Sequence, residues 1–169
     1  MEKVMGIDIR VVTGIISALV AILISVINHF IVEPIKRKRQ RKRDQLHNLY
    51  APLYSLFNYR MEISITHIAQ TQSIKLGGIK GDEISSKEYL TRLFMEKAGY
   101  ASESLIDHLT EYCGNINITP GMTDRLVRTT VKEYNQLKKD LKIPYNLAEL
   151  ETGFPELLAK QGFNESNFK

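Results

Sequence analysis

The chain has 169 residues, of which 43% are hydrophobic and 25% are charged, and its formal net charge is +4. This length and balance are typical of one ordinary folded domain with an appendage. Its single Cys excludes a disulfide framework within the chain and a cysteine-rich zinc site.

The charge is concentrated in one place. Residues 11–32 contain no Asp, Glu, Lys or Arg, residues 33–43 carry a net charge of +6, and residues 44–169 carry a net charge of −2. The positive charge of the protein therefore belongs to a short basic run, Lys36 to Arg43, and the bulk of the chain is slightly acidic.

The uncharged segment from Val11 to Val32 predicts a membrane-spanning helix. As a helix it would be about 33 Å long at roughly 1.5 Å per residue, which matches a hydrocarbon core of about 30 Å. A buried core helix seldom runs this far without a charge, and a cleaved signal peptide would need its basic residues before the apolar run. We therefore predict an extracytoplasmic N-terminus (1–10), an uncleaved transmembrane helix (11–33) and a basic juxtamembrane segment (34–45), with a kink or break at Pro34.

The basic run predicts the orientation of this helix. Seven Lys or Arg residues follow the apolar segment and two precede it, so the C-terminal side is expected in the cytoplasm of a single-pass protein of the cytoplasmic membrane. The run is expected to contact anionic lipids of the inner leaflet. Its members are Lys36, Arg37, Lys38, Arg39, Arg41, Lys42 and Arg43. Nucleic-acid binding is a weaker alternative, because the slightly acidic remainder offers no second basic face.

One face of the predicted span carries small and polar residues at three- and four-residue steps. They are Gly14, Ser17, Ala18, Ala21, Ser25 and Asn28. Such a face lets helices approach closely in lipid, and Ser or Asn can form hydrogen bonds across the interface. The pattern predicts self-association of the anchor, although the same residue types are common in all membrane helices.

Beyond the basic run, the spacing of apolar residues predicts an all-α cytoplasmic domain over residues 46–162. The first helix is expected to start near Arg37 and to kink near Asn48, because Pro52 lies inside it. A second helix is expected over 85–114, starting with a capping box, Ser85-x-x-Glu88, unless Gly99 or Ser102 divides it.

A third long helix is expected over residues 123–141, and two short helical pieces are expected over 146–152 and 156–161. Three long amphipathic helices with short connections predict an antiparallel bundle. Residues 163–169 are expected to form a loose tail.

The sequence offers few residues for catalysis. Asp107, His108 and Glu111 lie at helical spacing and could form an acid–base group, but a solvated helix face explains them more simply. No metal-binding or nucleotide-binding motif is present, so we predict no cofactor and no enzymatic activity. Three tyrosines that follow the basic run, Tyr50, Tyr54 and Tyr59, are candidates for a partner-docking surface. The alternative is that Tyr50 lies in the core and the other two lie at its rim.

These features predict a non-enzymatic, membrane-anchored module that binds a protein partner or a second copy of itself at the cytoplasmic face. The layout resembles that of many bacterial and prophage membrane proteins, and membrane-local signalling, phage exclusion or scaffolding would fit it. Two alternatives are a membrane-permeabilising oligomer formed through the transmembrane helix and a membrane-tethered nucleic-acid binder.

Overall fold

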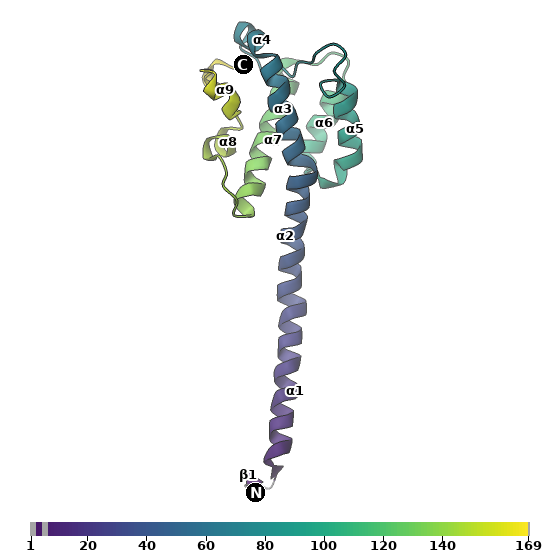
Figure 1. Cartoon of the computed structure of the whole chain (residues 1–169), viewed down its shortest axis with the longest axis vertical. Helices are drawn as coiled ribbons and strands as arrows, with labels where there is room; N and C mark the ends of the chain where they lie inside the picture. The colour runs from purple at the N-terminus through teal and green to yellow at the C-terminus, as the bar shows by residue number, and fades with distance from the viewer. Residues whose placement is uncertain (1–2, 5–6, 169) are drawn as a thin grey trace. The chain divides into compact units, whose positions relative to one another are not determined.

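The structure is a computed structural model, and it describes residues 3–4 and 7–168 (Figure 1). The chain divides into two compact units, an N-terminal unit (Met1–Arg41) and a C-terminal unit (Lys42–Lys169). The prediction of a helical protein with a long apolar N-terminal helix is confirmed. The sequence did not predict the two short strands, β1 (Lys3–Val4) and β2 (Ile7–Asp8), which pair antiparallel.

The N-terminal unit contains helix α1 (Ile9–Ile27), a π-helical turn η1 (Asn28–Val32) and the start of helix α2 (Glu33–Gln45). These segments belong to one helical run of 54 residues, Arg10–Ile63. Its most apolar window has a mean hydropathy of 2.5, and none of that window is buried. Within the described residues, this helix is long and apolar enough to cross a membrane.

Both prolines in this run are preceded by a π-helical turn. The second of these turns, η2 (Leu46–Tyr50), precedes Pro52 as η1 precedes Pro34. The backbone N–H of Glu33 bonds the carbonyl of Asn28, and that of Ala51 bonds the carbonyl of Leu46, in each case five residues back. A proline cannot donate this bond, and its ring clashes with the carbonyl four residues earlier, so a wider turn accommodates it.

The helix therefore continues through both positions. The break that we considered at Pro34 does not occur, and the position near Asn48 where we expected a kink lies in the π turn η2.

The C-terminal unit contains the end of the long run and a set of shorter helices. They are α3 (Ala51–Ile63), α4 (Ile65–Thr71), α5 (Lys87–Lys97), the 3₁₀ turn η3 (Ala98–Tyr100), α6 (Glu103–Gly114), α7 (Pro120–Asp140), α8 (Leu147–Thr152), α9 (Glu156–Lys160) and the 3₁₀ turn η4 (Glu165–Asn167).

The predicted bundle of three long helices is not what forms, because the second predicted helix is divided. Ser102 has an extended backbone, and its side chain accepts a hydrogen bond from the N–H of Leu105, so it begins α6 as an N-cap. The cap of α5 is Ser86, which accepts from Tyr89, and not Ser85 as the capping box suggested. The Ser85 hydroxyl instead bonds the loop before the helix.

The core lies along one face of the η2–α3 segment. Leu49, Leu53, Phe57 and Met61 recur every four residues, and each is at most 1% exposed. They pack with buried side chains of the other helices, namely Leu90 of α5, Leu105 and Leu109 of α6, and Leu126, Val127 and Val131 of α7. Burying a side chain of this size contributes about 1.5–3 kcal/mol, so this face supplies much of the stability of the unit.

Helix α7 lies antiparallel to the N-terminal end of this segment. The hydroxyl of Tyr50 donates to Glu133 Oε2 (2.8 Å), and Lys42 Nζ lies 2.7 Å from Asp140 Oδ2. The later residue of α7, Asp140, contacts the earlier residue of the long helix, Lys42, so the two helices run in opposite directions. On another side, Gln45 donates to the backbone carbonyl of Tyr100 (3.1 Å).

The C-terminal residues make more contacts than a loose tail would. Phe168 packs on Phe154 with ring centroids 5.1 Å apart, and Glu165 forms an ion pair with Arg128 at 2.5 Å. Arg128 also binds Asp124 one helical turn away, so α7 holds the segment that follows α9.

Gly153 ends α8 with a left-handed backbone, φ +74°. A Cβ atom there would lie 2.9 Å from both the Cβ and the carbonyl oxygen of Arg128. We expect Gly153→Ala to destabilise the unit by about 3 kcal/mol, because left-handed strain adds to overpacking. Gly81→Ala is the control, since Gly81 has φ +90° with nothing within 4 Å, and it should cost about 1 kcal/mol. Chemical unfolding of the full chain in detergent measures both, and equal losses would contradict the packing argument.

Candidate functional site

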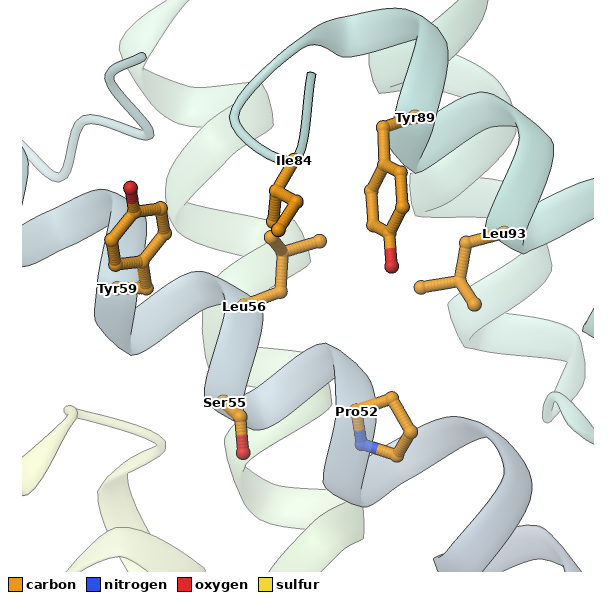
Figure 2. Close-up of a pocket in the computed structure, with 7 residues that line it drawn as sticks. All are labelled: Pro52, Ser55, Leu56, Tyr59, Ile84, Tyr89 and Leu93. Atoms are coloured by element: carbon orange, nitrogen blue, oxygen red, sulfur yellow. The ribbon is translucent and has the colours of Figure 1, made fainter. Parts of the chain in front are cut away.

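An apolar groove of about 370 Å³ lies between α3 and α5 in the C-terminal unit. Figure 2 shows Leu56 and Ile84 between Tyr59 on one side and Tyr89 and Leu93 on the other. Pro52 and Ser55 complete the lining. Ile84 is 51% exposed and Tyr59 is 42% exposed, so the groove presents large apolar surface to solvent.

The loop between α4 and α5 forms one wall of this groove. Tyr59 donates a hydrogen bond to Asp82 Oδ2 (3.1 Å), and this bond raises the pKa of the Tyr59 hydroxyl. Asp82 Oδ1 accepts from the backbone N–H of Ile84 (3.2 Å), and the carbonyl of Asp82 accepts from the Ser85 hydroxyl (3.2 Å). These bonds hold Ile84 against the end of α3.

A buried arginine ties this loop to α3. Arg60 is 2% exposed, and its guanidinium donates to the backbone carbonyls of Ser85 and Ser86. Among the residues that the structure describes, no carboxylate forms an ion pair with it, and burial lowers its pKa from the usual range. Arg60 thus fixes the start of α5 on α3 and sets the spacing of the two groove walls.

The three candidate tyrosines do not form one surface. Tyr50 is 2% exposed, and its hydroxyl both donates to Glu133 and accepts from the N–H of Ser102 (3.0 Å). The Ser102 hydroxyl donates to the same carboxylate at 2.6 Å. This small network joins η2, α6 and α7 inside the fold.

Tyr54 is half-buried and takes part in a second network, around the buried carboxylate of Glu149. Its hydroxyl donates to Glu149 Oε1 (2.8 Å), and Asn135 Nδ2 donates to Oε2 (2.9 Å). The N–H of Glu156 gives a third bond at 2.8 Å. The ring of Tyr54 stacks on Tyr134 with centroids 4.3 Å apart. Of the three tyrosines, Tyr59 is therefore the one that lines the groove.

Sequence reasoning missed the residues opposite Tyr59. Ile84, Tyr89 and Leu93 lie about 30 positions further along the chain, beyond a glycine-containing loop. Tyr89 and Leu93 recur at helical spacing with Leu90 and Phe94, which indicates an apolar helix face, but nothing in the sequence says against which part of α3 that face lies.

The basic run lies on α2, and its cations are mostly exposed. Consecutive residues of an α-helix point about 100° apart, so these side chains surround the helix rather than form one stripe. Arg37 pairs with Glu33 (3.2 Å), and Lys42 pairs with Asp140.

The small-residue face, which lies on α1 and ends at Asn28, the first residue of η1, is uncovered in the single chain. All six of its residues are exposed, and a Cβ added at Gly14 would have nothing within 4 Å.

His108 and Glu111 of the predicted acid–base group bind different residues rather than each other. His108 Nδ1 lies 3.0 Å from the Thr129 hydroxyl, and Glu111 binds Arg125 at 2.6 Å, both on α7. Within the described part of the chain, no group of three His, Cys, Asp or Glu residues is placed to hold a metal ion.

Comparisons with known protein families, with curated proteins and with solved structures give no match.

The tyrosine networks predict a loss of stability in alkali. Burial, aided by Glu133, raises the pKa of Tyr50 to about 12, and burial with Glu149 raises that of Tyr54 as well. An unfolded chain loses these protons near pH 10. The native state retains them, so stability should be complete below pH 10 and should fall as the pH rises toward 12.

We expect Tyr50→Phe to destabilise the neutral protein by about 1–3 kcal/mol, because Glu133 and the Ser102 N–H lose a partner. The variant should also lose less stability between pH 10 and 12 than the wild type. Unfolding midpoints against pH measure both effects. Tyr145→Phe, which removes the hydroxyl of an exposed tyrosine, serves as the control. A slope in Tyr50→Phe equal to that of the wild type would contradict the network.

Proposed function

We propose that the chain is a single-pass protein of the cytoplasmic membrane that holds its C-terminal unit at the cytoplasmic face as a non-enzymatic interaction module. The observation that carries this proposal is the apolar, unburied window of the Arg10–Ile63 helix, followed directly by seven cations. The partner is a protein or a second copy of this chain.

The exposure of the apolar segment supports a lipid environment. Side chains such as Leu19, Ile22 and Leu23 are 60–61% exposed in the isolated chain. Soluble proteins rarely expose contiguous apolar patches beyond a few hundred Å², because each Å² left in water costs about 25 cal/mol. A bilayer covers such a helix, and the helix satisfies its own backbone hydrogen bonds there.

The arrangement of the cations supports lipid contact over nucleic-acid contact. Headgroups surround an emerging helix on all sides, as the side chains of the basic run do, whereas a nucleic-acid backbone would meet one face. The run is expected to stop transfer and to keep the C-terminal unit in the cytoplasm.

The groove between α3 and α5 supports the interaction role. It is apolar, it is open to solvent, and its walls are fixed by Arg60 and by the Tyr59–Asp82 bond. Confinement to a membrane raises the effective concentration of a partner, so even a small contact of this kind would be sufficient.

The topology can be tested with cysteine labelling in a bacterial host, in a Cys113→Ser background. We expect Lys3→Cys to react with a membrane-impermeant maleimide on intact cells and Ser166→Cys to react only after lysis. Labelling of Ser166→Cys on intact cells would overturn the orientation. Release of the chain from membranes by alkaline carbonate would overturn the membrane span itself.

The groove can be tested with two isoleucines. Ile84 lines the groove and is 51% exposed, whereas Ile116 is 96% exposed and does not line it. We expect Ile84→Asp to reduce capture of the partner by the full-length protein from detergent-solubilised membranes by at least about tenfold, because one charge enters an apolar contact. Ile116→Asp should leave capture unchanged, and equal effects of the two variants would remove the groove from the proposal.

A further inference from the structure

The turn between α7 and α8 exposes an unusual combination of side chains. Ile143, Tyr145 and Leu147 are 41%, 39% and 54% exposed. Lys139 and Lys142 are exposed beside them, and no acidic residue lies between Leu141 and Ala148. The nearby carboxylate at the end of α7, that of Asp140, is paired with Lys42.

We propose that this turn, residues 138–147, is a second lipid-contact site that docks the C-terminal unit onto anionic headgroups. The proposal rests on the membrane anchoring proposed above and adds a contact that the anchor alone does not provide.

Hydrogen bonds to buried groups fix the conformation of the turn, and they thereby fix which of its side chains point outward. Asn135 is 1% exposed, and its Oδ1 accepts from the backbone N–H of Asn146 (2.9 Å). The side chain of Asn146 caps α8 by accepting from the N–H of Glu149 (3.2 Å). Residues on either side of Asn146 therefore face solvent while Asn146 itself faces the protein.

After the end of α7, Lys142 occupies a backbone position that glycine would adopt more easily. The N–H of Ile143 bonds the carbonyl of Lys138 (2.9 Å), and the N–H of Lys142 bonds that of Lys139 (3.0 Å). This pattern is a Schellman motif, whose left-handed position is usually Gly and whose next residue usually packs against the helix. Here Lys142 adopts φ +60°, and Ile143 remains exposed. As a result, a cationic side chain and an apolar side chain, which suit contact with lipid, both lie on the surface.

The turn lies at the end of the C-terminal unit at which the chain enters it. The Lys42–Asp140 pair puts the end of α7, and so the start of the turn, beside the first residue of the unit.

This chemistry fits a bilayer surface. Aromatic and aliphatic side chains flanked by lysines are typical of segments that lie at the headgroup layer. Each lysine near an anionic surface contributes about fivefold in binding. A protein partner would be the other occupant of this patch, and the experiment below distinguishes the two.

The chain contains no Trp, so a single substitution reports on the site. Full-length Tyr145→Trp is reconstituted in vesicles of phosphatidylcholine with phosphatidylglycerol, and in vesicles of phosphatidylcholine alone. We expect a blue-shifted Trp emission that is shielded from acrylamide and quenched by nitroxide-headgroup lipids in the anionic vesicles. These effects should be several-fold weaker in phosphatidylcholine alone.

Tyr59→Trp is the matched control for position. Tyr59 has a similar exposure, 42%, but lies 17 residues beyond Lys42 on the same helix, about 25 Å away. The emission of the Tyr59→Trp variant should not respond to the lipid.

The lysines can be tested in the Tyr145→Trp background. Adding Lys139→Gln and Lys142→Gln should weaken the binding of the turn to the anionic lipid surface by at least about tenfold. Acrylamide should then regain access to the indole. Adding Lys139→Arg and Lys142→Arg instead keeps both charges, so the shielding should remain.

Three results would overturn the proposal. The first is equal nitroxide quenching in the Tyr145→Trp and Tyr59→Trp variants, and the second is quenching that does not depend on the anionic lipid. The third is a blue shift without nitroxide quenching, which would assign the patch to protein contact. Carbonate extraction of the same samples tests the anchor separately. A Tyr145→Trp chain that stays in the bilayer with its indole free in water would refute this contact alone.

Discussion

The C-terminal unit depends on the buried face of the η2–α3 segment. Leu49, Leu53, Phe57 and Met61 form its apolar line, and the hydroxyls of Tyr50 and Tyr54 leave the same segment to reach carboxylates on α7 and α8. The apolar contacts supply non-directional stability, whereas the two hydroxyl bonds are directional and fix which residues of α7 and α8 lie opposite. Because a buried carboxylate without its donors is costly, other registers of these helices are disfavoured.

This dependence explains why the candidate groove lies where it does. The helix that carries the core also forms one wall of the groove, so Tyr59, Leu56 and Pro52 are as firmly placed as the core itself. The opposite wall is fixed by Arg60, whose guanidinium holds the start of α5 through backbone carbonyls. The docking surface that we propose has preformed walls, so a partner's binding would cost it little conformational entropy.

The sequence was sufficient to predict the helical class, the apolar segment and most helix positions, because periodicity and charge are local signals. It could not predict how Pro34 and Pro52 are accommodated, since the π turns depend on where the backbone can relax. Nor could it choose Ser86 over Ser85 as the cap of α5, because Ser85-x-x-Glu88 fits the capping box whereas the residue three positions after Ser86 is Tyr89. The groove could not be predicted from the sequence for a different reason. Tyr59 and Leu93 line it together through tertiary packing, which no local spacing of residues encodes.

The π turn at Leu46–Tyr50 has a consequence for insertions and deletions in this helix. Such a turn contains one residue more than the α-helical turn it replaces. The side chains before it therefore point about 100° away from the directions that an uninterrupted α-helix would give them. The direction in which Lys42 and Gln45 point, toward Asp140 and Tyr100, is set by that surplus residue. A chain that lost this one residue could close an ordinary α-helical turn and keep both contacts, whereas an uninterrupted α-helix of the same length would rotate Lys42 and Gln45 about 100° away from Asp140 and Tyr100.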